Sequence, residues 1–198
     1  MTMTAFVKLN LPPLPSEVIQ EIRLSTNTLA FDKSKTEWMN SFHGNELNCA
    51  NHDYFIHDGI AEQVNSVYGK IFNQTIAPLV GIQRNTTNHV GLTPPHLDRI
   101  RYTAINFMID LGGDSVTTNF YDCYREEEHF NTAKNIHYNE INKVDGAVFG
   151  KYEWCAFNAQ QCNSVENIEN IRIFLGLRLE KNIKFDDFLV EYKDLIVV

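Results

Sequence analysis

Thr93-Pro94-Pro95-His96-Leu97-Asp98-Arg99-Ile100-Arg101 is the stretch that decides the fold, and it leads directly into the apolar segment 102–109. The two prolines keep the approach extended, because a residue that precedes proline avoids the helical region. The segment that follows is apolar on both faces, as expected of a strand in the middle of a sandwich. This stretch predicts a β-rich core with two polar side chains at one strand end.

His96 and Asp98 are two residues apart. Successive side chains of an extended chain alternate between faces, so both should point the same way. An imidazole and a carboxylate that converge in this manner supply two-thirds of a 2-His-1-carboxylate site for non-haem Fe(II). The alternative is a hydrogen-bonded His/Asp pair in a polar loop, and the motif counts only with its structural context.

The chain from residue 78 onward alternates short apolar segments with turns. We expect strands at 79–82, 89–92, 102–110, 116–121, 152–157 and 171–179, with turns at Gly112-Gly113 and Asp145-Gly146. Segment 171–179 alternates most regularly. One face should carry Ile171, Ile173, Leu175, Leu177 and Leu179, and the other Arg172, Phe174, Gly176 and Arg178.

Helices are expected at 16–23, 59–74 and 186–195, where apolar residues recur at helical spacing. Segment 25–57 is expected to be irregular, and the polar segment 123–140 to be an insertion. We therefore expect a mainly β (α+β) fold, a double-stranded β-helix or jelly roll with supporting helices. One domain should span 1–198, with helical support at about 16–75, a jelly-roll core at about 78–180 and a C-terminal helix at about 185–196.

Arg172 should face the interior beside Phe174 and Gly176. A buried arginine needs a partner, because an unpaired buried charge is costly. Its planar fork suits a carboxylate. That carboxylate could belong to an internal Asp or Glu, or to a ligand.

The order of these features resembles that of the 2-oxoglutarate/Fe(II)-dependent oxygenases, and more closely their small prolyl-hydroxylase-like bacterial and phage members. The similar stretches are 95–101, 106–121 and Asn163-Ser-Val-Glu-Asn-Ile-Glu-Asn-Ile-Arg172, which together span roughly residues 80–180. The resemblance implies a hydroxylase with Fe(II) and 2-oxoglutarate as cofactors. It implies that His96 and Asp98 bind the metal and that Arg172 binds the distal carboxylate of 2-oxoglutarate.

Asn163 departs from the family pattern, which places a second histidine about nine or ten residues before the arginine. An amide oxygen is a weaker ligand than imidazole, so Asn163 could bind the metal weakly or not at all. Cys162 should point to the opposite face. The remaining candidates for a substitute ligand are His89, His129 and His137, and only His89 lies near the predicted core.

Three further residues are expected near the site because they lie close to the His-x-Asp strand. Tyr102 or Asn106 could contact 2-oxoglutarate, and Arg101 could bind an acidic substrate near the mouth of the site. Arg99 and Arg101 flank Asp98, so one of them could instead pair with Asp98 or Asp110, or orient the carboxylate.

The composition is that of a globular protein, 43% hydrophobic and 21% charged with a net charge of −8. No basic cluster predicts nucleic acid or a membrane surface as a partner. The four cysteines lack CxxC spacing and are expected to be free thiols in a reducing compartment. The expected location is the cytoplasm, or the host cytoplasm if the protein is viral. A small-molecule co-substrate is expected, and the substrate is a protein side chain or a small molecule. The rival functions are a catalytically inactive binding or structural module and a cupin-like metal or sugar binder.

Overall fold

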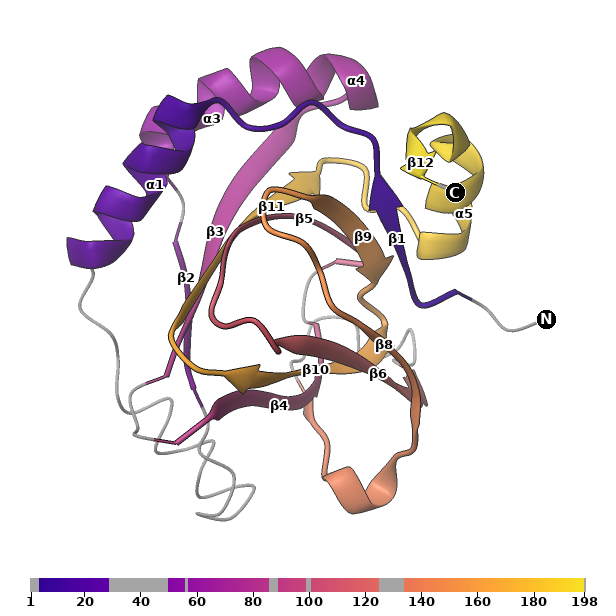
Figure 1. Cartoon of the computed structure of the whole chain (residues 1–198). Helices are drawn as coiled ribbons and strands as arrows, with labels where there is room; N and C mark the ends of the chain where they lie inside the picture. Colours follow the sequence, from indigo (N-terminus) through magenta and orange to yellow (C-terminus); the bar gives the residue numbers. More distant parts are fainter. Residues whose placement is uncertain are drawn as a thin grey trace.

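The computed structural model describes residues 4–28, 50–55, 57–85, 89–98, 101–124 and 134–197. Two antiparallel sheets face each other as layers, and helices cover the outer face of the larger sheet (Figure 1). Mostly β architecture with a few supporting helices confirms the predicted jelly-roll class. Within the described ranges, no helix is long and apolar enough to cross a membrane.

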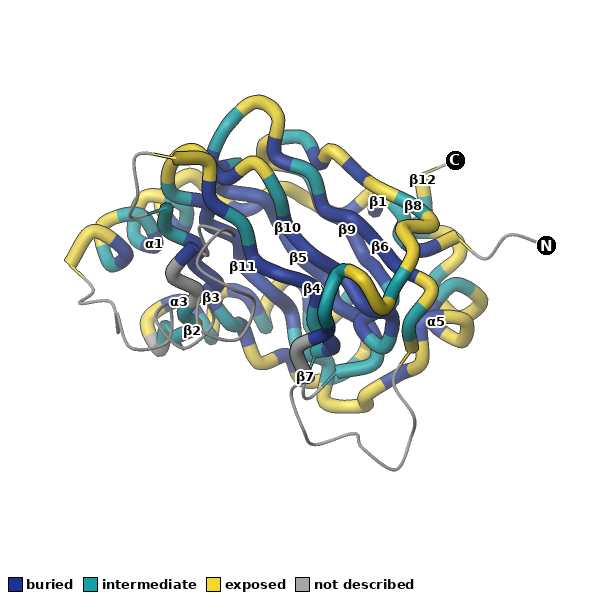
Figure 2. The backbone as a smooth tube through the Cα atoms, turned by 90° about the horizontal axis from the view of Figure 1, so that it is seen from below, coloured by how far each residue is buried: buried dark blue, intermediate teal, exposed yellow. Residues whose placement is uncertain are grey.

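The larger sheet has seven strands and the smaller has five. Their central strands are buried, as the dark tube in Figure 2 shows. The larger sheet runs in the order β12 (Ile196–Val197), β1 (Phe6–Leu9), β9 (Trp154–Asn158), β5 (Thr103–Leu111), β11 (Ile171–Leu179), β3 (Ile76–Arg84), β2 (Asn51–Phe55). The smaller sheet runs in the order β7 (Lys134–Asn135), β4 (Gly91–Leu97), β10 (Gln161–Ile168), β6 (Thr117–Tyr124), β8 (Lys143–Ala147).

The helices lie near the predicted positions. The chain forms α1 (Ser16–Thr28), α3 (Asp58–Val64), the π-helical turn η1 (Asn65–Gly69), α4 (Lys70–Phe72), η3 (Tyr138–Glu140), α5 (Phe185–Glu191) and η4 (Lys193–Leu195). The expected helix at 59–74 is therefore three consecutive helical segments. The Asn65 side chain donates to the oxygens of Ala61 and Ile76 and accepts from the nitrogen of Ile76 at 2.7 Å. These bonds connect the π-helical turn to the first residue of β3.

Strand β11 separates two hydrophobic cores. Ile173 and Leu175 pack with Ile22 of α1 and Ile60 of α3 on the helix side of the larger sheet. Phe174 points the other way, into the core between the two sheets with Phe120. The predicted alternation of β11 is confirmed, and it directs Arg172 into the space between the sheets.

Several expectations were wrong or fell short. Segment 25–57 is not irregular throughout, because α1 continues to Thr28 and residues 51–55 form β2. Asp145-Gly146 is not a turn; it lies within β8, where Gly146 pairs with Asn119 of β6. A Cβ at Gly146 would lie 3.0 Å from Asn119 Oδ1, so the glycine allows this close approach.

The polar segment 123–140 was expected to be an insertion, but both of its ends form regular secondary structure. Strand β6 runs on to Tyr124, and β7 and η3 lie within the expected insertion. Residues 125–133 lie outside the described part of the chain. Among the described residues Cys123, Cys155 and Cys162 form no disulfide, and Cys49 lies outside the described part.

Replacing Gly81 with alanine is expected to destabilise the protein by about 1–3 kcal/mol, as overpacking of a core does. A Cβ at Gly81 would lie 2.1 Å from Cζ of the Phe174 ring, which is 4% exposed in the core between the sheets. Urea unfolding measures the loss. Ala77→Ser, at an exposed position on the same strand, is the control and should change stability by under about 0.5 kcal/mol.

Asp110, near the end of β5, forms ion pairs with Arg23 of α1 and with Lys151. Arg23 donates to both carboxylate oxygens at 2.8 Å, and Lys151 Nζ lies 2.9 Å from Oδ1. Burial alone would raise the pKa of Asp110, but the hydrogen bonds from Arg23 and Lys151 lower it below its ordinary value. A lowered folded-state pKa adds stability that is present above about pH 4 and is lost as the pH falls further.

Asp110→Asn is therefore expected to lower the free energy of unfolding by about 1 kcal/mol at pH 7. The difference from the wild type should shrink at pH 3, because the wild-type contribution is then being lost. Urea unfolding at both pH values measures it, with the exposed Asp114→Asn as control. A difference that grows toward acid pH would contradict the assignment.

Candidate functional site

A small polar cavity lies between the two sheets. Six of the seven residues predicted for the site line it, namely His96, Asp98, Arg101, Asn106, Asn163 and Arg172. Its free volume of about 20 Å³ is room for about one water molecule. Side chains must therefore move apart before a larger ligand can enter.

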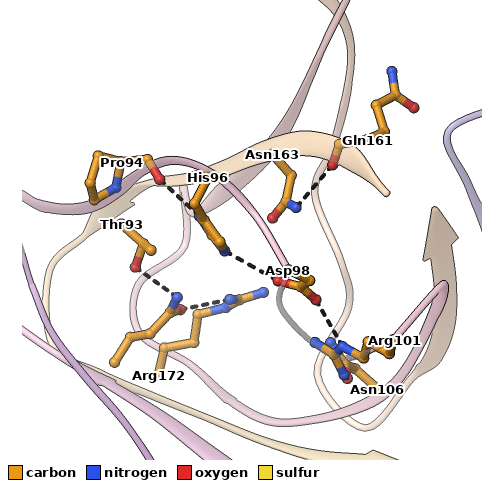
Figure 3. A network of polar contacts seen from close by, with 10 residues as sticks. Thr93, Pro94, His96, Asp98, Arg101, Asn106, Gln161, Asn163 and Arg172 are labelled. Carbon is orange, nitrogen blue, oxygen red and sulfur yellow. Dashed lines mark hydrogen bonds and ion pairs between the residues drawn. The ribbon is translucent and has the colours of Figure 1, made fainter. Parts of the chain in front are cut away.

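His96 and Asp98 project into the cavity from the end of β4 (Figure 3). The carbonyl oxygen of Pro94 lies 2.9 Å from His96 Nδ1 and can only accept, so Nδ1 carries the proton. The other ring nitrogen, Nε2, lies 3.4 Å from Asp98 Oδ1. Two ligand atoms at right angles around one metal ion lie roughly 3 Å apart when each bond is about 2.1 Å. The observed spacing is close to that geometry.

Arg101 holds the other oxygen of Asp98. Its Nε donates to Asp98 Oδ2 at 2.8 Å, and its Nη1 donates to Asn106 Oδ1 at 3.4 Å. Burial opposes ionisation of Asp98, but the charges of Arg101 and His96 together hold its pKa well below the ordinary range. Arg101 thus lines the cavity and pairs with Asp98. Of the two positions considered from the sequence, this is the pairing with Asp98 and not the one at the mouth of the site. Its part in binding a substrate stays a prediction.

Asn163 lies directly opposite His96 where β10 pairs with β4. Its side chain is 4% exposed, and its Nδ2 donates to the oxygen of Gln161 at 3.3 Å. The amide faces the same space as His96 and Asp98 (Figure 3). Cys162 points to the opposite face and packs with Tyr121, as the alternation predicts.

The donors in the cavity fit a divalent metal in part. His96 offers an imidazole nitrogen and Asp98 a carboxylate oxygen, both at a suitable spacing, while Asn163 offers a neutral amide oxygen. In the part of the chain that the structure describes, no three His, Cys, Asp or Glu side chains are grouped as a metal site. His89 and His137 do not line the cavity, so neither replaces Asn163 there, and His129 lies outside the described residues. This set predicts weak metal binding by the protein alone.

Arg172 is a buried cation whose partners are neutral. Its side chain projects from β11, the residue is 6% exposed, and Nη1 donates to Gln83 Oε1 at 2.7 Å. Gln83 in turn donates to Thr93 Oγ1 at 2.7 Å, and Arg172 Nη2 lies 3.7 Å from Met108 Sδ. Burial lowers the pKa of Arg172 to about 10. Among the described residues no carboxylate pairs with it, so the internal ion pair considered from the sequence is not formed there.

Three polar residues of the cavity were missed by sequence reasoning, namely Gln83, Thr118 and Tyr54. Thr118 Oγ1 is buried, lines the cavity and has no hydrogen-bond partner among the described residues. Tyr54 of β2 closes one side, with its ring edge-on to Phe174 at 6.2 Å between centroids. Thr118 could have been predicted, because it lies two residues before the apolar Phe120 on β6 and therefore shares its face. No periodic pattern in the sequence marks Tyr54.

Tyr102 does not reach the cavity. It lines a separate open hollow with Lys181 and Asn182, and its backbone nitrogen donates to Asn182 Oδ1 at 2.9 Å. Tyr102 is therefore not among the residues that line the cavity, and its contact with 2-oxoglutarate stays a prediction. Arg99 lies outside the described residues.

No protein-family model matches this sequence, and no curated protein matches it. Among solved structures, the fold is similar to that of SnoN, a non-haem alpha-ketoglutarate-dependent epimerase from nogalamycin biosynthesis. That match has a TM-score of 0.50 and 10% identity, and covers 87% of this chain and 77% of the epimerase.

Two further structures are similar at lower scores. SnoN in complex with Fe3+, alpha-ketoglutarate and nogalamycin RO gives a TM-score of 0.47 at 10% identity, over 87% of this chain and 77% of that one. A prolyl 4-hydroxylase from Phytophthora capsici gives 0.36 at 12% identity, over 82% and 61%. At such identities the match to SnoN shows that this chain shares its jelly-roll fold, and nothing finer.

Proposed function

We propose that this protein is an Fe(II)- and 2-oxoglutarate-dependent oxygenase that hydroxylates a protein side chain or a small molecule. The observation that carries the proposal is Arg172, a buried cation without an acidic partner among the described residues. It opens onto the same cavity as His96 and Asp98. A buried guanidinium with neutral neighbours can form a charge-assisted pair of hydrogen bonds with a ligand carboxylate, because no protein carboxylate competes for it among the described residues.

Each side chain has a definite part in this proposal. His96 Nε2, Asp98 Oδ1 and the Asn163 amide oxygen would hold the metal. Arg172 would bind the distal carboxylate, and the buried Thr118 hydroxyl offers the cavity a further hydrogen-bond donor. When bound, iron and 2-oxoglutarate supply the oxidising chemistry, with succinate and carbon dioxide as products. The protein positions both and excludes water.

Anaerobic isothermal titration with Mn(II) and 2-oxoglutarate tests the proposal. We expect both to bind when both are present, and succinate to form when Fe(II) and oxygen replace Mn(II). Protein that takes up neither Mn(II) nor 2-oxoglutarate from the mixture would rule out the assignment.

Asn163 favours a second candidate, a dicarboxylate-binding module that has kept the fold and lost the chemistry. A neutral amide is a poor replacement for imidazole, and removing even a supporting contact of a metal ligand costs about 10–100-fold in affinity. This candidate predicts 2-oxoglutarate binding through Arg172 without any succinate formation. Succinate measured by mass spectrometry, with Fe(II) and ascorbate present, separates the two.

A further inference from the structure

We propose that the cavity binds a metal ion tightly only together with a dicarboxylate dianion, because Arg101 neutralises Asp98 from within the site. The inference rests on the proposed function and concerns how the two ligands depend on each other. Three features of the cavity carry it, namely its balance of charge, the way Arg101 is fixed, and the neutral side chain at position 163.

The balance of charge in the cavity is positive. Among the described residues that line it, Asp98 is the one carboxylate, whereas Arg101 and Arg172 are both guanidinium cations. Both cations are largely enclosed, since the Arg101 side chain is 12% exposed and Arg172 is 6% exposed. Charges repel far more strongly in such a site than in water. A divalent cation that enters alone raises the positive charge further, and a dianion offsets it.

Arg101 is built into the site as the counter-ion of Asp98. It is fixed by Asp98 Oδ2 and Asn106 Oδ1, and its guanidinium lies 5.9 Å from the centre of the Phe157 ring. Gly176 on β11 lies next to this pair, and a Cβ there would lie 3.2 Å from Asn106 Oδ1, the oxygen that accepts from Arg101. A metal ion at Asp98 Oδ1 therefore shares its carboxylate with a cation that cannot easily leave.

The neutral side chain at position 163 makes the dependence stronger. Asn163 brings neither a charge nor a strong donor, so the protein offers the metal two good ligands and one weak ligand. A dianion held by Arg172 supplies the missing negative charge. If it is a 2-oxo acid, its other end also supplies oxygen donors. The weak protein site becomes a complete one only when the dianion is present.

The experiment is anaerobic titration of Mn(II) into the full chain with and without saturating 2-oxoglutarate, corrected for binding of Mn(II) by 2-oxoglutarate in solution. We expect 2-oxoglutarate to tighten Mn(II) binding by at least about 10-fold, and Mn(II) to tighten 2-oxoglutarate binding by the same factor, as linkage requires. Succinate, which has both carboxylates but no keto group, should keep part of this effect because part of it arises from charge.

Two variants of Arg101 test its role. Arg101→Gln removes the charge and keeps a hydrogen-bond donor, and it should bind Mn(II) alone more tightly than the wild type. Its coupling with succinate should fall to under about 3-fold, and its coupling with 2-oxoglutarate should fall in part, because the oxygen donors of the 2-oxo acid remain. Arg101→Lys keeps the charge and should retain the wild-type coupling. A merely structural role would instead weaken Mn(II) binding in both variants. Far-UV circular dichroism checks that each is folded.

Every outcome decides the matter. Equal Mn(II) affinity with and without 2-oxoglutarate would overturn the coupling and leave the oxygenase proposal standing. Absence of Mn(II) binding even with 2-oxoglutarate would overturn both. Coupling that disappears with succinate, or succinate coupling that is unchanged in a folded Arg101→Gln, would overturn the charge argument. If Arg101→Gln does not fold, the wild-type measurements with 2-oxoglutarate and succinate still decide.

Discussion

Arg172→Met is expected to remove 2-oxoglutarate binding with little change in the stability of the ligand-free protein. Loss of one partner of a buried, hydrogen-bonded charge pair costs about 2–5 kcal/mol, so affinity should fall by at least about 30-fold. The free protein loses little, because it no longer buries a cation whose described partners are neutral. That relief offsets the loss of the donor to the buried Gln83 Oε1, so we expect the stability of the free protein to change by under about 1 kcal/mol.

Two measurements on one protein check this expectation. Isothermal titration gives the affinity for 2-oxoglutarate, and urea unfolding gives the stability of the free protein. Arg178→Met is the matched control, because Arg178 lies on the same face of β11 and lines a different hollow. It should leave the affinity unchanged. If Arg172→Met loses stability and keeps its affinity, the arginine is structural and the oxygenase proposal fails.

The parts of the fold that were predicted correctly are the strands whose own residues show which side chains are buried. Strand β11 alternates between two cores, so its pattern of Ile and Leu against Phe and Arg could be read directly. The same holds for β5, which is apolar on both faces. The placement of Arg172 followed from that alternation alone.

The parts that were missed depend on pairing with distant segments. Strand β2 reads Asn-His-Asp-Tyr-Phe, without alternation, and forms because it pairs with β3 from Asn51 opposite Arg84 to Phe55 opposite Val80. Strand β1 pairs with both β9 and the C-terminal β12. Backbone pairing of this kind leaves little trace in side-chain periodicity.

The site shows the same division. His96 and Asp98 share a face because they lie two residues apart on an extended strand, and this was predictable. Arg101 and Asp98 form their ion pair between the end of β4 and the start of β5, and Thr118 reaches the cavity because β6 pairs with β10. A sequence pattern states which face a residue takes, but not which neighbour it meets there.

Asn163→His is expected to raise the affinity for Mn(II) in the absence of 2-oxoglutarate by at least about 10-fold. Position 163 is directly opposite His96 in the strand register, so an imidazole there would enter the space that His96 and Asp98 already share. Little is lost by the change, because the one hydrogen bond of Asn163 within the described structure is a long one to Gln161. The new set of two imidazoles and one carboxylate is the one that non-haem Fe(II) sites use.

Asn163→Gln is the control for side-chain volume, since it enlarges the residue and keeps the amide, and it should bring no gain. Succinate formation with Fe(II) and 2-oxoglutarate is measured on all three proteins. Succinate from the histidine variant alone would assign the natural chain to the silent binding module, and succinate from the wild type as well would make it an oxygenase with an amide in its metal site. If the histidine variant folds but gains no affinity for Mn(II), the His96–Asp98 pair is a structural hydrogen bond, and the metal assignment must be withdrawn.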